Sequence, residues 1–215
     1  MTLPRWMVRL IFRLLYNELA FTYDLVAWLV SFGEWGAWRR TVLCCLGEAP
    51  ILDLAHGTGG LMVDLLSRGH TPFGLDLSPY MGRIARRRLV GGHLPVRLVR
   101  GRAQQLPFPD RSFGTVLVTF PAEFVLDPAT LRSVARVLRP GGRLVIVVMG
   151  YLRPVPLLRW LINRAYDLTT PRPVSEAAAL RRLESAGFAA RWEDAEVDGA
   201  RARLLVAVRT GETGQ

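Results

Sequence analysis

Two acidic residues, each carried by a short apolar run, frame the most informative part of this sequence. The run at 51–54 contains Asp53 and breaks into a glycine-rich turn, and after a helical pattern a second run ends at Asp76. A strand, a tight turn, a helix and a parallel strand in this order form a nucleoside pocket. Gly57 and Gly59 let the backbone approach a ligand without an intervening Cβ. We expect the Asp76 carboxylate to accept hydrogen bonds from two ribose hydroxyls.

The turn differs from the loops that bind phosphorylated nucleotides. The dinucleotide fingerprint requires a third glycine three positions after the second, and this chain has Met62 there. A phosphate loop ending in Gly-Lys-Ser or Gly-Lys-Thr is ruled out, because the chain contains no lysine. A nucleoside without phosphates therefore fits the turn better than NAD or ATP.

At these residues the sequence resembles the class I S-adenosylmethionine-dependent methyltransferases, whose first motif reads acid-x-Gly-x-Gly-x-Gly. The matching residues are Asp53, Ala55, Gly57 and Gly59, so alanine replaces one glycine. Downstream, residues 101–113 resemble the family segment that covers the adenine, and residues 135–146 resemble the helix, Pro-Gly-Gly turn and strand that complete the core. The resemblance is specific for the superfamily and does not name a substrate.

The resemblance implies S-adenosyl-L-methionine as the cofactor and assigns its site residue by residue. The residues expected to hold it are Tyr23, Asp53, Ala55, His56, Gly57, Thr58, Gly59, Asp76, Leu77, Arg102, Ala103, Gln104, Thr119 and Phe120.

Three of the residues in this region depart from the family pattern. Arg102 stands where the family usually has an acid that accepts a hydrogen bond from the adenine amino group, and a guanidinium has donors only. Gly114 stands where an acid often precedes the fourth strand. Together with Ala55, these departures keep open a non-catalytic module of the same fold that binds the cofactor or a partner.

Alternating strand and helix patterns predict the α/β class, with a Rossmann-like, doubly wound sheet. By resemblance the sheet has seven strands in the order 3-2-1-4-5-7-6, with the last strand antiparallel. After the first two strands we expect strands at 95–100, 115–120, 143–149 and 202–208, and helices at 79–90, 128–138 and 175–186.

The chain divides into an N-terminal helical cap, residues 1–46, and a methyltransferase core, residues 47–215. A basic amphipathic helix opens the cap, and a second helical stretch from about 19 to 32 stops at Gly33. Such helices can fold over the cofactor, and they can also lie in a membrane interface, which we keep as an additional alternative. Tyr23-Asp24 resembles a pair that precedes the core in ubiquinone and menaquinone-type methyltransferases, where the tyrosine approaches the cofactor. Packing within the cap is the alternative role for this tyrosine.

An apolar and basic insert at 150–173 lies where the family places substrate-recognition elements. It could form the mouth for a hydrophobic acceptor, and it could equally cover the core or form a dimer contact. The oligomeric state stays open.

The composition limits which other classes of protein fit this sequence. Half of the 215 residues are apolar, which is enough for one hydrophobic core. The adjacent Cys44 and Cys45 provide neither a disulfide framework nor metal-ligand spacing, so no metal is expected. We recognise no cleavable signal and no uncharged run of the ~20 residues that span a bilayer, so we expect a cytoplasmic protein, with contact at the inner membrane face as the alternative. The net charge of +10 keeps an RNA methyltransferase as a less favoured alternative.

Methyl transfer from a sulfonium is an in-line displacement, in which the protein aligns donor and acceptor and excludes water. The sequence Thr119-Phe120-Pro121-Ala122 replaces the Asn/Asp-Pro-Pro-Tyr/Phe signature of nucleic-acid amino methylation. We therefore expect a small hydrophobic or lipid-like acceptor, such as a quinone precursor. If the acceptor must lose a proton, Glu123 is the favoured catalytic base over Asp127 and His56.

Overall fold

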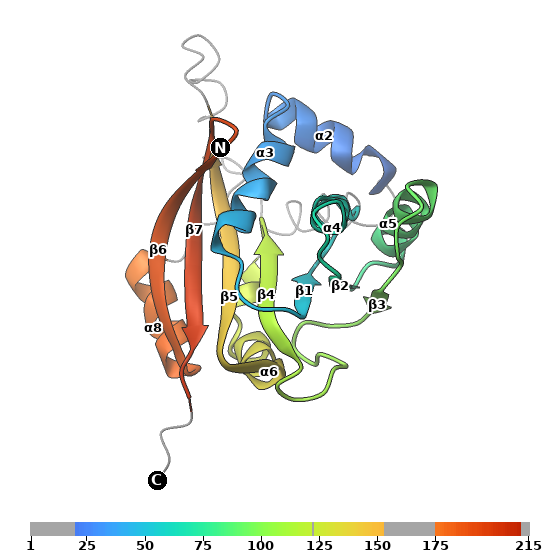
Figure 1. Cartoon of the computed structure of the whole chain (residues 1–215). Helices are drawn as coiled ribbons and strands as arrows, with labels where there is room; N and C mark the ends of the chain where they lie inside the picture. The colour runs from blue at the N-terminus through green and yellow to red at the C-terminus, as the bar shows by residue number, and fades with distance from the viewer. Residues whose placement is uncertain (1–19, 122, 153–174, 212–215) are drawn as a thin grey trace, which may run out of the picture.

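The computed structural model describes residues 20–121, 123–152 and 175–211. These residues form one seven-stranded sheet in the order β3-β2-β1-β4-β5-β7-β6 (Figure 1). Strands β1 to β5 pair in parallel, and β7 runs antiparallel to both β5 and β6. The predicted fold class and strand order are confirmed. Residues 1–19 of the expected cap and residues 153–173 of the expected insert lie outside the described residues.

The elements follow the predicted alternation of strands and helices. The strands are β1 (Ile51–Leu54), β2 (Phe73–Asp76), β3 (Leu98–Arg100), β4 (Phe113–Thr119), β5 (Leu138–Tyr151), β6 (Phe188–Val197) and β7 (Ala200–Arg209). The helices are η1 (Ala20–Thr22), α2 (Tyr23–Val30), α3 (Trp35–Arg40), η2 (Thr41–Cys45), α4 (Gly60–Leu66), α5 (Pro79–Gly91), η3 (Glu123–Leu126), α6 (Pro128–Val137) and α8 (Glu176–Ser185).

Strand β5 begins earlier than predicted and includes the Pro-Gly-Gly turn. Leu138 already pairs with Phe113 of β4, and the register then shifts before Arg143 pairs with Thr115. Gly141 has a φ of +76°, a left-handed conformation that glycine adopts without a steric penalty. The turn is therefore an irregularity within the strand and not a separate loop before it.

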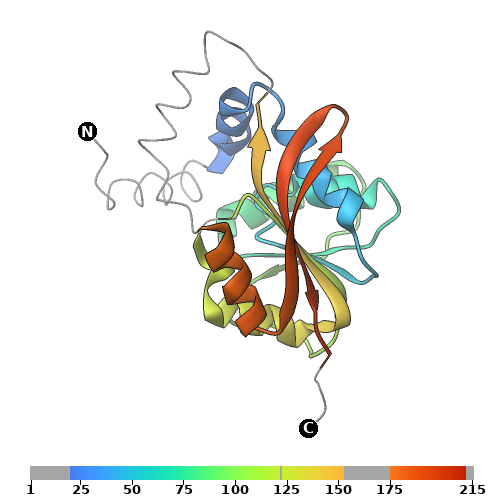
Figure 2. The ribbon, with the colours of Figure 1, turned by 90° about the vertical axis from the view of Figure 1, so that its left-hand side faces the viewer.

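The core has two layers, one on each face of the sheet. Alternate residues of β4 divide between them: Val116 and Val118 pack with α6 and α8, whereas Leu117 packs with η2 and α4. This alternation is the two-residue period of a strand that is buried on both faces. Figure 2 shows α8 on one side of the β6–β7 hairpin and α3 on the other.

Local signals begin and end the helices near the sheet. Ser78 and Asp127 cap α5 and α6 with their side chains, and a proline follows each cap. Helix α2 ends at Val30, slightly before the predicted end near residue 32. The predicted stop, Gly33, follows in the turn after it, with a φ of +84° and its N–H donated to the carbonyl oxygen of Trp28. Because β1 and β4 pair in parallel, their carboxyl ends lie at one edge of the sheet, with α2 above it in Figure 1.

Candidate cofactor and active site

Asp76 ends β2, and its carboxylate is oriented by the backbone around it. One oxygen accepts the N–H of Gly57 at 2.9 Å and the other accepts the N–H of Ser78 at 2.8 Å. An ionised carboxylate has about four acceptor positions. About two therefore stay available for the hydroxyls of a ribose. Leu77, the next residue, is 57% exposed beside it.

The glycine-rich turn is open at its centre and closed at its end. Gly57 has a φ of +54°, and no atom lies within 4 Å of the position that a Cβ would take. Gly59 has a φ of +79°, and a Cβ there would lie 2.8 Å from the Cβ of Ala85 on α5. The turn thus leaves space for a ligand at Gly57 while it packs against the core at Gly59.

His56 is a buried part of the same turn. Its Nδ1 lies 2.9 Å from the carbonyl oxygen of Gly57. Burial lowers the pKa of its imidazole, although the charge of Asp76 opposes the shift. A neutral ring that donates its Nδ1 hydrogen to Gly57 fits this geometry, and it supports a role in shaping the turn.

Asp53 is a buried carboxylate on β1, one residue before the strand ends. It is 1% exposed, and neither of its oxygens has a hydrogen-bond partner among the described residues. Burial raises its pKa to about 7, and the nearby charge of Arg39 opposes that rise. A buried polar group without a partner is costly, so this position favours a ligand that brings donors or positive charge. The ammonium group of S-adenosyl-L-methionine meets that requirement.

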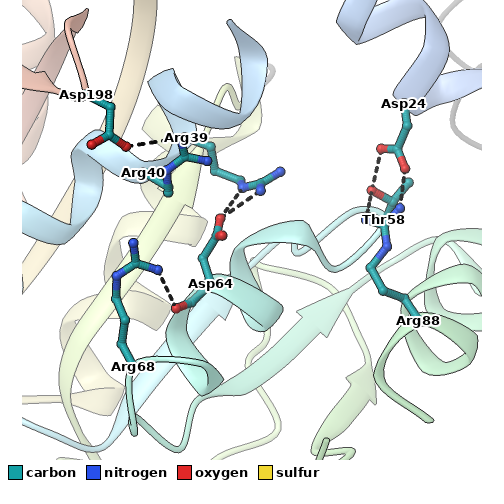
Figure 3. Close-up of polar contacts among 8 residues, drawn as sticks. All are labelled: Asp24, Arg39, Arg40, Thr58, Asp64, Arg68, Arg88 and Asp198. Carbon is teal, nitrogen blue, oxygen red and sulfur yellow. Dashed lines mark hydrogen bonds and ion pairs between the residues drawn. The ribbon is translucent and has the colours of Figure 1, made fainter. Parts of the chain in front are cut away.

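Three side chains tie the cap to the turn (Figure 3). Thr58 donates its hydroxyl to Asp24 of α2 at 2.7 Å, and Arg88 of α5 donates to the Thr58 hydroxyl at 3.2 Å. Arg88 also forms an ion pair with Asp24. From the sequence, Asp24 was identified only as the neighbour of Tyr23, and Arg88 had no predicted role in the site.

A second contact between cap and core was also missed from the sequence. Arg39 of α3 donates to Oδ2 of Asp64 on α4 from Nε at 3.1 Å and from Nη2 at 2.7 Å (Figure 3). The two residues are separated by 25 positions, which is no recognisable spacing. Only the packing of α3 beside α4 brings them together.

Aromatic side chains line the region after the carboxyl end of β4. Phe120, which follows Thr119, stacks on Trp35 with ring centroids 4.1 Å apart. Trp35 also meets the edge of Tyr23 at 6.3 Å, and Trp38 lies 6.4 Å from Phe120. Two predicted site residues, Tyr23 and Phe120, are therefore joined through Trp35, which had no predicted role. We call Tyr23, Trp35, Trp38 and Phe120 the aromatic wall.

The segment expected to cover the adenine begins beside Asp76. The N–H of Gly101 donates to the Asp76 backbone carbonyl at 3.1 Å. Within the segment Ala103 is buried, while Gln104 donates to Asp127 at 3.3 Å. The Arg102 side chain is exposed. Its guanidinium has donors only, so it does not replace the acceptor that the family's acid provides.

Gly114 has a steric reason for departing from the family's acid. It lies inside β4, and a Cβ there would be 2.4 Å from the carbonyl oxygen of Glu48. No side chain fits at that distance. The favoured catalytic base, Glu123, begins η3 shortly after β4, and its side chain lies outside the described part of the structure.

Comparison with known proteins gives the family. Residues 52–146 match the family model described as a methyltransferase domain. The chain is 36% identical over 205 residues to a demethylmenaquinone methyltransferase of Thermus thermophilus, covering 83% of this chain and 93% of that protein. It is 35% identical over 163 residues to the ubiquinone/menaquinone biosynthesis C-methyltransferase UbiE of Cronobacter sakazakii, covering 71% of this chain and 62% of the relative.

Solved structures agree at the level of the fold. A geranyl diphosphate methyltransferase in complex with S-adenosylmethionine superposes with a TM-score of 0.62 at 20% identity, covering 82% of this chain and 85% of that one. The geranyl diphosphate C-methyltransferase of Streptomyces coelicolor, in complex with S-adenosyl-L-homocysteine, gives a TM-score of 0.61 at 19% identity over 81% of this chain and 79% of the other. This chain belongs to the class I S-adenosylmethionine-dependent methyltransferases, within the group of the ubiquinone and menaquinone-type enzymes.

Proposed function

We propose that this enzyme transfers a methyl group to a ring carbon of a quinone precursor, with the acceptor lying against the aromatic wall. The observation that carries the proposal is the stacking of Phe120 on Trp35 beside the end of β4, next to the strand that holds Asp53. Flat apolar rings suit a flat apolar acceptor. The names of the relatives, a demethylmenaquinone methyltransferase and a quinone C-methyltransferase, support the same acceptor class.

When bound, S-adenosyl-L-methionine supplies an electrophilic methyl group on a sulfonium. The chain's own residues hold and orient the reactants: Asp76 binds the ribose, and Asp53 binds the ammonium group. The aromatic wall excludes water from the reactants. Such positioning accounts for most of the catalysis expected of an in-line transfer.

A hydroquinone carbon becomes a strong nucleophile when its neighbouring hydroxyl loses a proton. The ring carbon then forms a bond to the methyl carbon as the sulfur–methyl bond breaks. The ring proton at that carbon passes to solvent to restore aromaticity, and the proton held by the base returns to the quinol oxygen. Glu123 is the proposed acceptor of the hydroxyl proton, because it follows β4 at the edge where the site lies.

Paired variants test this role. Glu123→Gln should lower kcat by roughly 10²- to 10⁴-fold, the usual contribution of a general base. Asp127→Asn tests the other acidic candidate without loss of the helix cap, because Asp127 caps α6 and asparagine caps helices about equally well, and it should keep near wild-type turnover. Full turnover by Glu123→Gln on the true acceptor would remove Glu123 from the mechanism and leave the acceptor class untouched.

The acceptor is tested with a labelled methyl donor. The full chain is incubated with it and either a reduced naphthoquinone that lacks the ring methyl group or the same compound already methylated. We expect label in the organic phase, on carbon, with the unmethylated compound alone. Label in added RNA, or none on the quinol while the donor binds normally, would contradict the proposal.

We also propose that α2 rests on an anionic lipid surface, from which a hydrophobic acceptor would enter. None of the helices in the described ranges is long and apolar enough to cross a bilayer. The outward side of α2 and its flanks is apolar, and the arginines of the neighbouring α5 add positive charge. The apolar residues are 45–74% exposed: Phe21, Leu25, Trp28, Leu29 and Phe32. The exposed arginines are Arg83, Arg86 and Arg87.

Vesicle flotation tests this contact. The full chain should float with phosphatidylglycerol-containing vesicles at low salt and less with pure phosphatidylcholine. The pair Leu25→Gln and Leu29→Gln should abolish flotation, whereas Val148→Gln, an exposed apolar residue on β5, should not. Equal flotation of both variants, or none of the wild type, would contradict the lipid contact without affecting the methyl transfer.

A further inference from the structure

Arg39 is placed by the cap directly over the start of the cofactor site. Two of its three guanidinium nitrogens, Nε and Nη2, donate to Asp64. The third, Nη1, lies over Gly60, where a Cβ would be only 2.2 Å away. The glycine therefore makes room for the guanidinium at the point where the turn continues into α4.

Asp53 lies close to Arg39, and the positive charge of Arg39 opposes the rise in the pKa of the Asp53 carboxyl. Its strand neighbour Ile51 packs on the sheet face covered by α4 and η2, and in a strand residues 51 and 53 share a face. Asp53 thus points to the side of the sheet on which Arg39 and Asp64 lie. A buried carboxylate without a hydrogen-bond partner in the described structure and a guanidinium whose Nη1 lies over Gly60 thus flank the same turn.

We propose that Arg39 binds the α-carboxylate of the methyl donor while Asp53 binds its α-ammonium group. An amino acid carries these two charges on one carbon, and an anionic and a cationic side chain on either side of the turn match them. The side-on bonds to Asp64 hold the guanidinium in position and leave Nη1 to donate to the ligand. This inference rests on the family's cofactor and is independent of the quinone acceptor proposed above.

Ligands with and without the amino acid separate this role from a structural one. S-adenosyl-L-homocysteine carries the amino acid, and 5′-methylthioadenosine keeps the nucleoside and sulfur without it. Calorimetry on the full chain measures both affinities. We expect Arg39→Gln to weaken the binding of S-adenosyl-L-homocysteine by roughly tenfold or more, because a charge-assisted hydrogen bond to its carboxylate is lost. The affinity for 5′-methylthioadenosine should change less than about twofold.

The neighbouring arginine is the matched control. Arg40, on the same helix, pairs with Asp198 at 3.2 Å and is remote from the turn, so Arg40→Gln should leave both affinities unchanged. Gly60→Ala should reproduce the Arg39→Gln pattern, because the added Cβ displaces Nη1 without removing the arginine. Arg39→Lys should recover part of the loss through its charge.

The outcomes are distinct. An equal loss for both ligands in Arg39→Gln would show a purely structural role and overturn the assignment, as would no loss for either. Failure of the wild type to bind either ligand would overturn the cofactor site itself. Failure of the quinol to become methylated, with the ligand discrimination intact, would overturn only the acceptor proposal.

Discussion

Gly59 and Ala85 lie so close together that a Cβ on residue 59 would be 2.8 Å from the Cβ of Ala85. Residue 59 lies in the turn and residue 85 on α5, so this contact fixes the helix after β2 against the cofactor turn. The left-handed φ of +79° at Gly59 adds a second reason for glycine.

Gly59→Ala should therefore destabilise the protein by about 2–5 kcal/mol, combining overpacking with the left-handed backbone penalty. Gly69→Ala separates the two causes, because Gly69 has a φ of +81° and no atom near the Cβ position. Urea unfolding should show a smaller loss for Gly69→Ala, about 1–2 kcal/mol. Equal losses would mean that Ala85 does not constrain residue 59.

Ala55 is a non-glycine residue in a left-handed conformation, with a φ of +62°. Ala55→Gly removes a penalty of about 1–2 kcal/mol and adds about 0.5–1 kcal/mol of chain entropy to the unfolded state. We expect a net gain of about 1 kcal/mol and a Tm increase of about 2–4 °C. Ala189→Gly, at an exposed position of β6, should lower the Tm instead, since only the entropy cost applies there. A lower Tm for Ala55→Gly would contradict this account.

The raised pKa of Asp53 predicts a specific pH dependence. The carboxyl has an ordinary value of 3.8 and about 7 in the folded protein, so between these values the folded state binds more protons than the unfolded state. The contribution of this group to the free energy of unfolding is fully present below its unfolded-state pKa of 3.8, and it is lost as the pH rises through about 7. Asp53→Asn should abolish this loss, which chemical denaturation at a series of pH values would reveal.

The same carboxyl should release a proton when the cofactor binds. An ammonium group beside Asp53 favours its ionised form and lowers its pKa. Near pH 7, the pKa of Asp53 in the folded protein, calorimetry of S-adenosyl-L-homocysteine binding in buffers of different ionisation enthalpy should detect that proton. If the Asp53→Asn variant still released a proton on binding, the proton would come from another group.

The contact between Arg88 and Asp24 should matter more for the position of the cap than for global stability. Both side chains are partly exposed, at 35% and 46%, so the pair contributes only about 0–1 kcal/mol to stability. Arg88→Gln should nevertheless increase amide hydrogen exchange in α2, because it removes one of the links between α2 and the core. Arg87→Gln, at the exposed neighbouring residue, is the control and should leave exchange in α2 unchanged.

Local sequence signals predicted the α/β class and the strand, turn and helix around the expected cofactor site. The apolar runs that carry Asp53 and Asp76, and the glycines between them, specify strand, turn and helix through short-range backbone preferences. Parallel pairing then places these acids at one sheet edge. The strand order and the family were predicted from the resemblance that these motifs carry to the class I methyltransferases. The contact of Gly57 with Asp76 is a direct consequence of that pairing.

Tertiary packing decided how the cap meets the site. Arg39 and Asp64, or Trp35 and Phe120, are far apart along the chain and have no fixed spacing, because their contact depends on the angle at which α3 crosses the sheet edge. The same packing leaves Asp53 buried without a partner in the described structure, a property that no residue type or position reveals. Long-range contacts of this kind are set by the whole core, whereas the turn and its strands are set by the residues that form them.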